Sequence, residues 1–135
     1  MLFRSSNLKL QKILYFLQAQ FMVSRGYPLF RDPIKAVDWG PMVENVYHNY
    51  KMFGAASIPV MHEEQYPYNI DGEDAILIGE VLDYLEPYSA TYLLSLIHNQ
   101  TPWKTAYYGG SKYISNDALK EFFKSETVEN EKGSV

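Results

Sequence analysis

Apolar residues recur at helical spacing over most of the chain. The clearest case is residues 7–25, where apolar positions three or four apart define one face of a helix. Ser6 or Asn7 can cap the start of this predicted helix, and Gly26 can end it. Its apolar face consists of Leu10, Ile13, Leu14, Leu17 and Phe21.

The same periodicity returns in the C-terminal half, interrupted by residues that begin or end helices. The predicted caps are Asp71, Ser89, Thr101 and Ser115. The helix after Thr101 has Pro102 at its first position, where the missing N–H is not needed, and Gly109-Gly110 ends it. The buried stripes are expected to be Ala75, Ile78, Leu82 and Leu85, then Leu93, Leu96 and Ile97, and finally Leu119, Phe122 and Phe123.

Residues 34–50 combine an extended stretch with a Trp-Gly-Pro corner. The extended part reads as a short strand. We expect Pro41 to occupy the first position of a helix, with Gly40 as its N-cap. Gly54 is expected to end this helix. Residues 55–71, which two prolines interrupt, are expected to form a mobile loop.

These patterns predict a mainly α fold. We expect a compact single-domain helical bundle of about five or six helices with at most one short β-hairpin or strand pair. A chain of 135 residues is the length of one ordinary domain. The helical domain is expected to span residues 1–124. Residues 125–135 are polar, charged and aperiodic, so we expect a disordered C-terminal tail.

Composition excludes several classes of protein. The chain has no cysteine, which excludes a disulfide framework, a thiol nucleophile and a Cys-based zinc site, and which fits a cytoplasmic location. A net charge of −4 argues against a general nucleic-acid binder. No apolar run approaches the roughly 20 residues of a membrane-spanning helix. The 12 tyrosines suit both core and interface, and we expect mostly core use.

Motifs for catalysis are scarce. The chain has no Gly-rich dinucleotide fingerprint, no complete P-loop and no nucleophile elbow, so we expect neither a catalytic residue nor a cofactor. One alternative is a small metal-binding enzyme in which His48, His62 and His98 converge on one ion at about 2.0–2.1 Å. Another is an autoregulatory DNA-binding repressor, although neither residues 42–51 nor the last helix offers a basic face.

Two features of the sequence have competing interpretations. Lys9 and Lys12 lie in the first turns of the first helix, where the plain interpretation is a solvated face with flexible lysines. The sharper interpretation pairs Lys12 with a carboxylate on a neighbouring element or on a partner. Trp39 and Trp103 each begin a tight corner, and each is either a core residue or a recognition hot spot.

Several motifs, taken in order along the chain, resemble those of one known family. The matching segments are residues 7–15 (NLKLQKILY), Pro28-Leu29-Phe30, Ile34 and Ala36 followed by Trp39-Gly40-Pro41-Met42-Val43, Val46-Tyr47, Leu93, Leu96 and His98, Thr101-Pro102-Trp103-Lys104 and Ala106, and Ile114-Ser115-Asn116. Together they resemble the Panacea family, the SocA-like antitoxin domain that also occurs in phage-associated GepA-like proteins. The resemblance covers roughly residues 7–123.

The resemblance implies a compact helical domain that performs no reaction and acts by binding protein. It implies the antitoxin of a toxin–antitoxin pair of prophage or mobile-element type, which masks its toxin or acts as a proteolytic adaptor. The implied partners are a cognate toxin and a Clp-type protease, and neither a membrane nor a nucleic acid is expected. We expect partner contacts from Lys12, Tyr15, Trp39, Gly40, Pro41, Tyr47, His98 and Trp103.

The beginning of the sequence departs from the family pattern. Relatives usually carry another helix before the Leu-Lys-Leu-Gln-Lys motif, whereas this sequence begins almost at that motif. Either the start codon is misassigned or the domain is trimmed. In a trimmed domain the first helix loses a packing partner, and we expect the apolar strip between Leu10 and Phe21 to be exposed and to support a homodimer.

Overall fold

The computed structural model describes residues 6–50 and 72–133. Within these residues the chain forms six helices and a three-stranded antiparallel sheet, which confirms the mainly α fold and adds one strand to the expected hairpin. The helices are α1 (Asn7–Ser24), α2 (Glu44–Tyr50), α3 (Gly72–Leu85), α4 (Ala90–His98), α5 (Thr101–Tyr108) and α6 (Asn116–Gly133). The strands are β1 (Ile34–Val37), β2 (Gly40–Met42) and β3 (Tyr113–Ile114).

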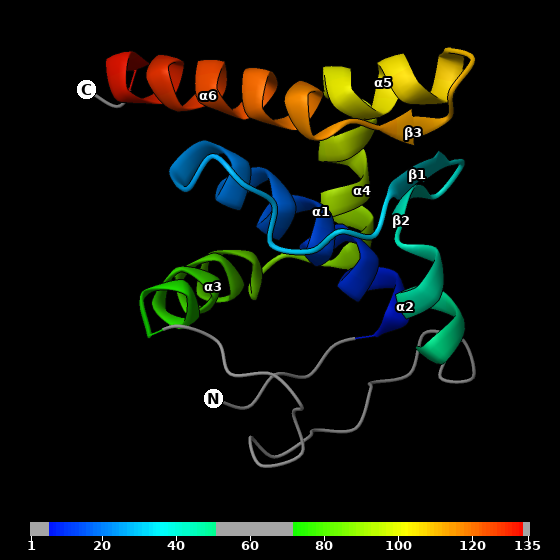
Figure 1. The fold of residues 1–135 in the computed structure, drawn as a ribbon, viewed down its shortest axis with the longest axis horizontal. Coiled ribbons are helices and arrows are strands. Elements are labelled where there is room, and N and C mark those ends of the chain that lie inside the picture. Colours follow the sequence, from blue (N-terminus) through cyan, green and yellow to red (C-terminus); the bar gives the residue numbers. More distant parts are fainter. Residues whose placement is uncertain (1–5, 51–71, 134–135) are drawn as a thin grey trace.

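Helix α1 is the central element of the fold. It contacts α6, α3, α4, β2 and α2, and in Figure 1 it crosses the middle of the molecule between α6 and α3. Ser6 caps it as predicted, because its Oγ accepts a hydrogen bond from the Lys9 backbone N–H at 3.1 Å. Ile13, Leu17 and Phe21 are buried. The expectation of an exposed strip on this helix is therefore wrong, and the predicted homodimer loses the apolar surface on which it depended.

The Gly-Pro corner is part of a hairpin and not the start of a helix. Gly40 pairs with Val37 and Pro41 with Ala36, so the predicted Gly40 cap and the helical position of Pro41 are both wrong. Gly40 has a φ of +111°, which glycine adopts readily after a tight turn. Strand β2 lies at the edge of the sheet, where the missing N–H of proline is tolerated.

The other predicted helix boundaries depend on local side-chain chemistry, and most are confirmed. Ser89 Oγ and Ser115 Oγ each accept a hydrogen bond from a backbone N–H in the first turn of the following helix, at 3.0 Å. Gly109 is the C-cap of α5. At the start of α5 the N-cap is Gln100 and not Thr101, and it makes no side-chain capping bond. The predicted boundary residues Asp71 and Gly54, and the predicted loop, lie outside the described residues.

The last helix is longer than predicted. Helix α6 continues to Gly133, so the backbone after residue 124 is helical where we expected an irregular tail. Glutamate and lysine, which are frequent in residues 126–132, are good helix formers even where no apolar periodicity marks a buried face. The division of the chain into a domain and a tail stays a prediction.

Buried polar side chains on α1 connect this helix to the loops around it. Gln11 accepts a hydrogen bond from the Val43 backbone N–H at 2.8 Å and donates one to the Asn7 side chain at 3.0 Å. Gln18 accepts from the Leu29 backbone N–H at 2.9 Å and donates to the Phe30 carbonyl at 2.8 Å. The loop before β1 and the residue before α2 are thus held by amide groups in the core, where an unpaired polar group is unfavourable.

Candidate functional site

Several of the sequence-predicted contact residues meet around the turn of the β1–β2 hairpin. Trp103 of α5 is buried, and its Nε1 donates to the Val37 carbonyl at 3.0 Å. The ring of Tyr107 stacks on it with 4.4 Å between centroids, and the Tyr107 hydroxyl donates to the Asp38 carboxylate. This hydrogen bond raises the pKa of Tyr107. His98 Nε2 lies 2.9 Å from the Asp38 carbonyl oxygen. Helices α4 and α5 therefore hold the turn from one side.

Lys12 lies on the other side of the hairpin, beneath Trp39. Its side chain is only 2% exposed, and its Nζ donates to the Leu8 carbonyl at 3.1 Å and lies 5.8 Å from the centre of the Trp39 ring. Desolvation lowers the pKa of Lys12 from 10.5 to about 8. The interpretation of Lys12 as a solvated lysine is therefore wrong. No described carboxylate pairs with Lys12, and a pair with a carboxylate of a partner stays a prediction.

The remaining predicted contact residues are divided between core and surface. Tyr15 is fully buried, and its hydroxyl donates to Gln100 Oε1 at 2.7 Å. Burial raises the pKa of Tyr15. Gly40 and Pro41 are also buried. Trp39 and Tyr47 are half-buried, with 5.1 Å between their ring centroids. Tyr15, Gly40 and Pro41 are thus core residues of this fold. A partner contact by any of the predicted residues, among them the half-buried Trp39, Tyr47 and His98, stays a prediction.

The two described histidines of the metal hypothesis, His48 and His98, pack against different aromatic residues. His48 packs its ring against Tyr47 at 5.5 Å between centroids, whereas His98 packs against Trp103 at 4.3 Å. His62 lies outside the described residues. Within the described part of the chain, no group of three or more His, Asp or Glu side chains is placed to hold a metal ion.

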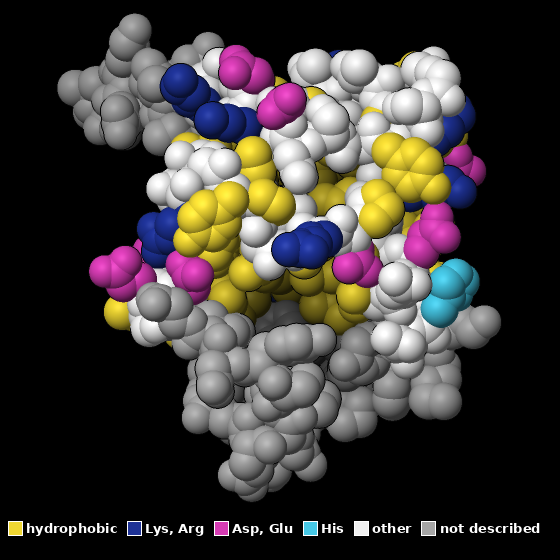
Figure 2. Space-filling view, in the orientation of Figure 1, with side chains coloured by type: hydrophobic (Ala, Val, Ile, Leu, Met, Phe, Trp, Pro, Cys, Tyr) yellow, Lys and Arg dark blue, Asp and Glu magenta, His cyan; other side chains and the backbone are white. Residues whose placement is uncertain are grey.

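Charge is mixed on the face of the molecule drawn in Figure 2. There the Lys and Arg side chains lie among Asp and Glu side chains and form no basic patch. On α6, Lys120 and Lys124 alternate with Asp117 and Glu121. These features give no support to the repressor alternative, because a recognition helix in the major groove needs a basic surface.

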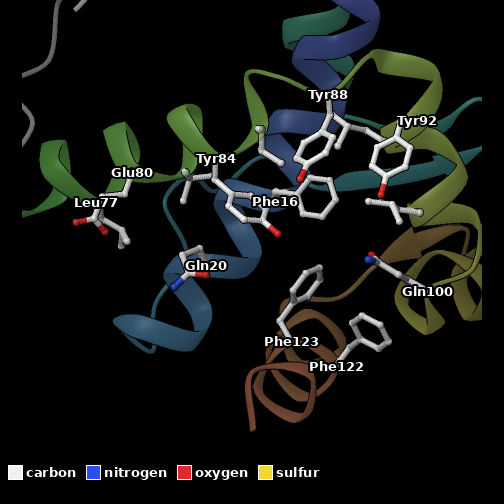
Figure 3. A pocket seen from close by; sticks show the side chains of 14 residues that line it. Phe16, Gln20, Leu77, Glu80, Tyr84, Tyr88, Tyr92, Gln100, Phe122 and Phe123 are labelled. Atoms are coloured by element: carbon white, nitrogen blue, oxygen red, sulfur yellow. The ribbon is translucent and has the colours of Figure 1, made fainter. Parts of the chain in front are cut away.

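A groove lies on another part of the surface, between α1, α3, α4 and α6. Its volume is about 500 Å³, and its lining is mostly apolar and aromatic. Figure 3 shows rings from α1, α3, α4 and α6 around this space, with Glu80 toward one end and Gln100 toward the other. The lining includes Phe16, Tyr84, Tyr88, Tyr92, Leu96 and Phe122.

Three tyrosines form one wall of the groove across the α3–α4 corner. The ring centroids of Tyr84 and Tyr88 are 6.0 Å apart, and Tyr88 and Tyr92 stack with centroids 5.0 Å apart. Tyr84 is 71% exposed and Tyr92 is 46% exposed. Large aromatic side chains with polar tips are enriched where proteins bind each other, so this wall is a candidate contact surface.

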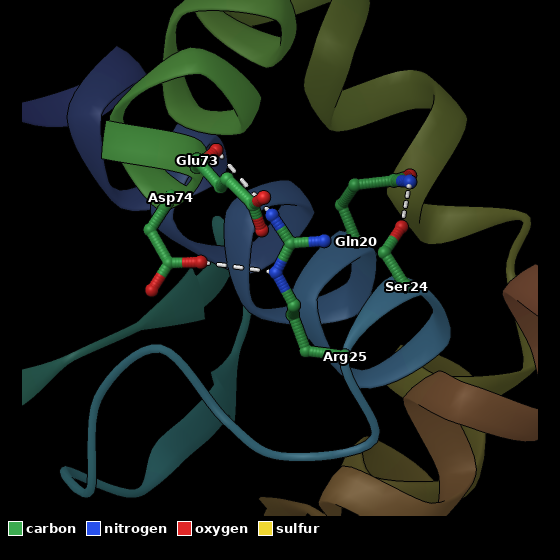
Figure 4. Close-up of polar contacts among 5 residues, drawn as sticks. All are labelled: Gln20, Ser24, Arg25, Glu73 and Asp74. Atoms are coloured by element: carbon green, nitrogen blue, oxygen red, sulfur yellow. Dashed lines mark hydrogen bonds and ion pairs between the residues drawn. The ribbon is translucent and has the colours of Figure 1, made fainter. Parts of the chain in front are cut away.

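Helix α3, which lines one side of the groove, is acidic and contributes Glu80 to the lining. Residues 72–86 contain five carboxylates and no basic residue. One of the five, Asp74, pairs with Arg25 at the end of α1, with 3.0 Å between Nε and Oδ1. Figure 4 shows this pair together with the second bond of Arg25, from Nη2 to the Glu73 carbonyl at 3.3 Å. Arg25 therefore fixes the first turn of α3 against α1 and leaves the outer carboxylates of α3 facing solvent.

A family model described as antitoxin SocA-like, Panacea domain, matches residues 10–104. The chain belongs to this SocA-like Panacea family. No curated protein and no solved structure matches the chain. The family suggests a role related to toxin–antitoxin systems and, with it, a toxin as partner. Among the described helices of this SocA-like domain, none is long and apolar enough to cross a membrane.

The residues of the SocA-like match include the hairpin and only part of the groove. The match covers the hairpin and helices α3 and α4, and it ends inside α5. Helix α6, which supplies Phe122 to the groove, lies outside the matched range. One wall of the groove is thus made by a part of the chain that the family model does not match.

The groove was missed from the sequence because we looked for one buried stripe on each helix. The predicted stripe of α3 shares only Leu85 with the groove lining, and Ala75 within it is exposed. The groove wall instead follows a four-residue spacing that continues across the helix boundary, through Tyr84, Tyr88, Tyr92 and Leu96. That spacing is visible in the sequence and marks an aromatic face, of which Tyr84, Tyr92 and Leu96 are exposed.

Proposed function

We propose that this domain is the antitoxin of a toxin–antitoxin pair and that it neutralises its toxin by binding it, without catalysing a reaction. The observation that carries the proposal is the SocA-like Panacea match over residues 10–104. The exposed tyrosines and the apolar groove support it, because they form a surface suited to protein binding. The proposal places the pair in the cytoplasm and its genes in a prophage or another mobile element.

The test is growth in a host that expresses the reading frame next to this one in its genome. Induction of that neighbour alone is expected to arrest growth, and co-expression of this chain is expected to restore it. Direct binding is then measured with the two purified proteins. Growth that stays arrested despite stable expression of this chain contradicts the proposal.

A second arm distinguishes masking from delivery to a protease. If the antitoxin masks its toxin, rescue persists in a host that lacks the Clp protease and the toxin level stays unchanged. If the antitoxin is an adaptor, rescue disappears in that host and the toxin accumulates. We propose masking, because it requires only direct binding of the toxin, for which the groove provides a surface.

A further inference from the structure

We propose that the groove between α1, α3, α4 and α6 binds an amphipathic helix of a partner protein whose apolar stripe is flanked by Lys or Arg. The identity of that partner as the toxin rests on the proposed function. The chemistry of the bound helix rests on the groove alone.

The apolar part of the proposal follows from the lining. The groove is bounded by helices, and its volume of about 500 Å³ holds several large side chains. Leu96, which is 38% exposed, and the rings of Tyr84 and Phe122 come from three different helices and line the same space. A helix that places residues i, i+3, i+4 and i+7 into such a groove buries its apolar stripe and leaves its flanks at the rim.

The charge of the bound helix follows from α3. Glu80 lines the groove and is exposed, and Asp83, one turn further along α3, is exposed as well. No ion pair joins either of them to another described residue. On the α6 side, residues 116–125 contain two lysines and two carboxylates, so their charges balance. A helix with Lys or Arg on the flank next to α3 is therefore complementary in charge, whereas a helix with Glu there is repelled.

A second copy of this chain fits the groove poorly. Helix α1 carries Lys9 and Lys12, but it is the buried centre of its own fold. Helix α6 has as many acidic as basic residues in its described side chains, and α3 would bring its own carboxylates. None of these three described helices offers an exposed apolar stripe with a basic flank, which favours a helix of another protein as the occupant.

The first experiment measures binding of the toxin that this chain neutralises. Tyr84→Ala removes the exposed wall residue, and Glu80→Lys reverses the charge at the rim. Each is expected to weaken binding at least about tenfold, as for interface hot spots. The matched controls are Tyr108→Ala, which removes a tyrosine that is 77% exposed on α5, and Asp117→Lys on α6. Both controls are expected to change the affinity by less than about twofold, since neither residue lines the groove. Equal losses in variants and controls overturn the proposal.

The second experiment needs no toxin and separates the groove from the proposed function. The probe is a synthetic helical peptide with leucines on one face and lysines on both flanks, and its counterpart has glutamates on the flanks. Fluorescence anisotropy is expected to give at least about tenfold tighter binding of the lysine peptide, and Tyr84→Ala is expected to weaken it. Equal affinity for the two peptides overturns the proposal, as does a dimer of the wild-type chain that Tyr84→Ala dissociates. If the peptides discriminate but growth is not rescued, the proposed function fails and the groove assignment stands.

Discussion

Trp103 of α5 donates a hydrogen bond from its indole Nε1 to the backbone carbonyl of Val37, at 3.0 Å. Val37 is the last residue of β1, so this bond fixes the point at which the hairpin turns. Trp103 is also 5% exposed and belongs to the main core cluster. Its role in this chain is therefore to join the C-terminal helices to the hairpin.

Replacing Trp103 by Phe tests this role. Phe keeps most of the buried ring but cannot donate to the Val37 carbonyl, so we expect the free energy of unfolding to fall by about 1–3 kcal/mol. Urea denaturation followed by circular dichroism measures the change. Tyr108→Phe, which removes a hydroxyl from an exposed ring, is the control and is expected to change stability by less than about 0.5 kcal/mol. A loss in the control as large as that in Trp103→Phe would contradict the assignment.

Replacing Gln11 by Met tests the polar core of α1. Met fills a similar volume but leaves the Val43 N–H and the Asn7 side chain without their buried partner. We expect a loss of about 1–3 kcal/mol in the free energy of unfolding. The control is Gln20→Met, because among the described residues Gln20 bonds only Ser24, in an exposed pair, and the loss is expected to stay below about 0.5 kcal/mol. Similar losses at both positions would show that burial of the amide is not decisive.

The sequence predicted those features that neighbouring residues decide. Ser6, Ser89 and Ser115 were identified as caps because a hydroxyl before an apolar periodic segment satisfies the first free N–H groups of a helix. The fold class followed from the same periodicity. The hairpin was missed at Gly40-Pro41 because Pro after Gly is equally compatible with the first turn of a helix and with an edge strand. Pairing with Ala36 decides between them, and pairing is not a local property.

The candidate site was harder to predict, because sequence motifs do not distinguish core from surface. Lys12 and Tyr15 belong to the family-like motif, yet both are buried. Conversely, Tyr84 and Tyr92 face the groove, and we gave them no role beyond the general expectation of core use. A lysine at the start of a helix is usually solvated, and only the packing of the hairpin over α1 buries this one.

Gly40 allows the strain of a positive φ to be separated from a steric clash. A Cβ at Gly40 would lie 3.0 Å from Leu94 Cδ1, in a backbone with a φ of +111°. Gly40→Ala is expected to lower the free energy of unfolding by about 2–4 kcal/mol. Gly26, with a φ of +80° and open space around it, reports the backbone strain alone, and Gly26→Ala is expected to lose about 1–2 kcal/mol.

A third glycine completes this comparison. Gly110 has open space and no positive φ, so Gly110→Ala is expected to be neutral or stabilising, by up to about 1 kcal/mol. Thermal unfolding of the three variants gives the ranking directly. If Gly40→Ala were no worse than Gly26→Ala, contact with Leu94 would make no difference.

Lys12 gives the fold a dependence on pH whose sign can be derived. The folded chain lowers the pKa of this amine to about 8, against 10.5 in the unfolded chain. Between these values the unfolded chain binds more protons, so the contribution of Lys12 to stability increases with pH. Below pH 8 the amine is charged in the folded chain, and the free-energy cost of burying that charge is at its maximum. Above pH 10.5 the amine is neutral in both states, and this cost is absent.

Replacing Lys12 by Met removes this pH dependence. We expect Lys12→Met to be more stable than the wild-type chain at pH 7, because no charge is buried, and we expect the difference to shrink steadily from pH 8 to pH 10. Comparing the two proteins at each pH cancels the opposing effect of Tyr15, whose raised pKa destabilises both folds above pH 10. Urea denaturation across this range is the measurement, with Lys104→Met, at an exposed lysine of α5, as the control for the effect of the substitution itself. A difference between Lys12→Met and wild type that stays constant with pH would mean that the amine is solvated in the folded chain.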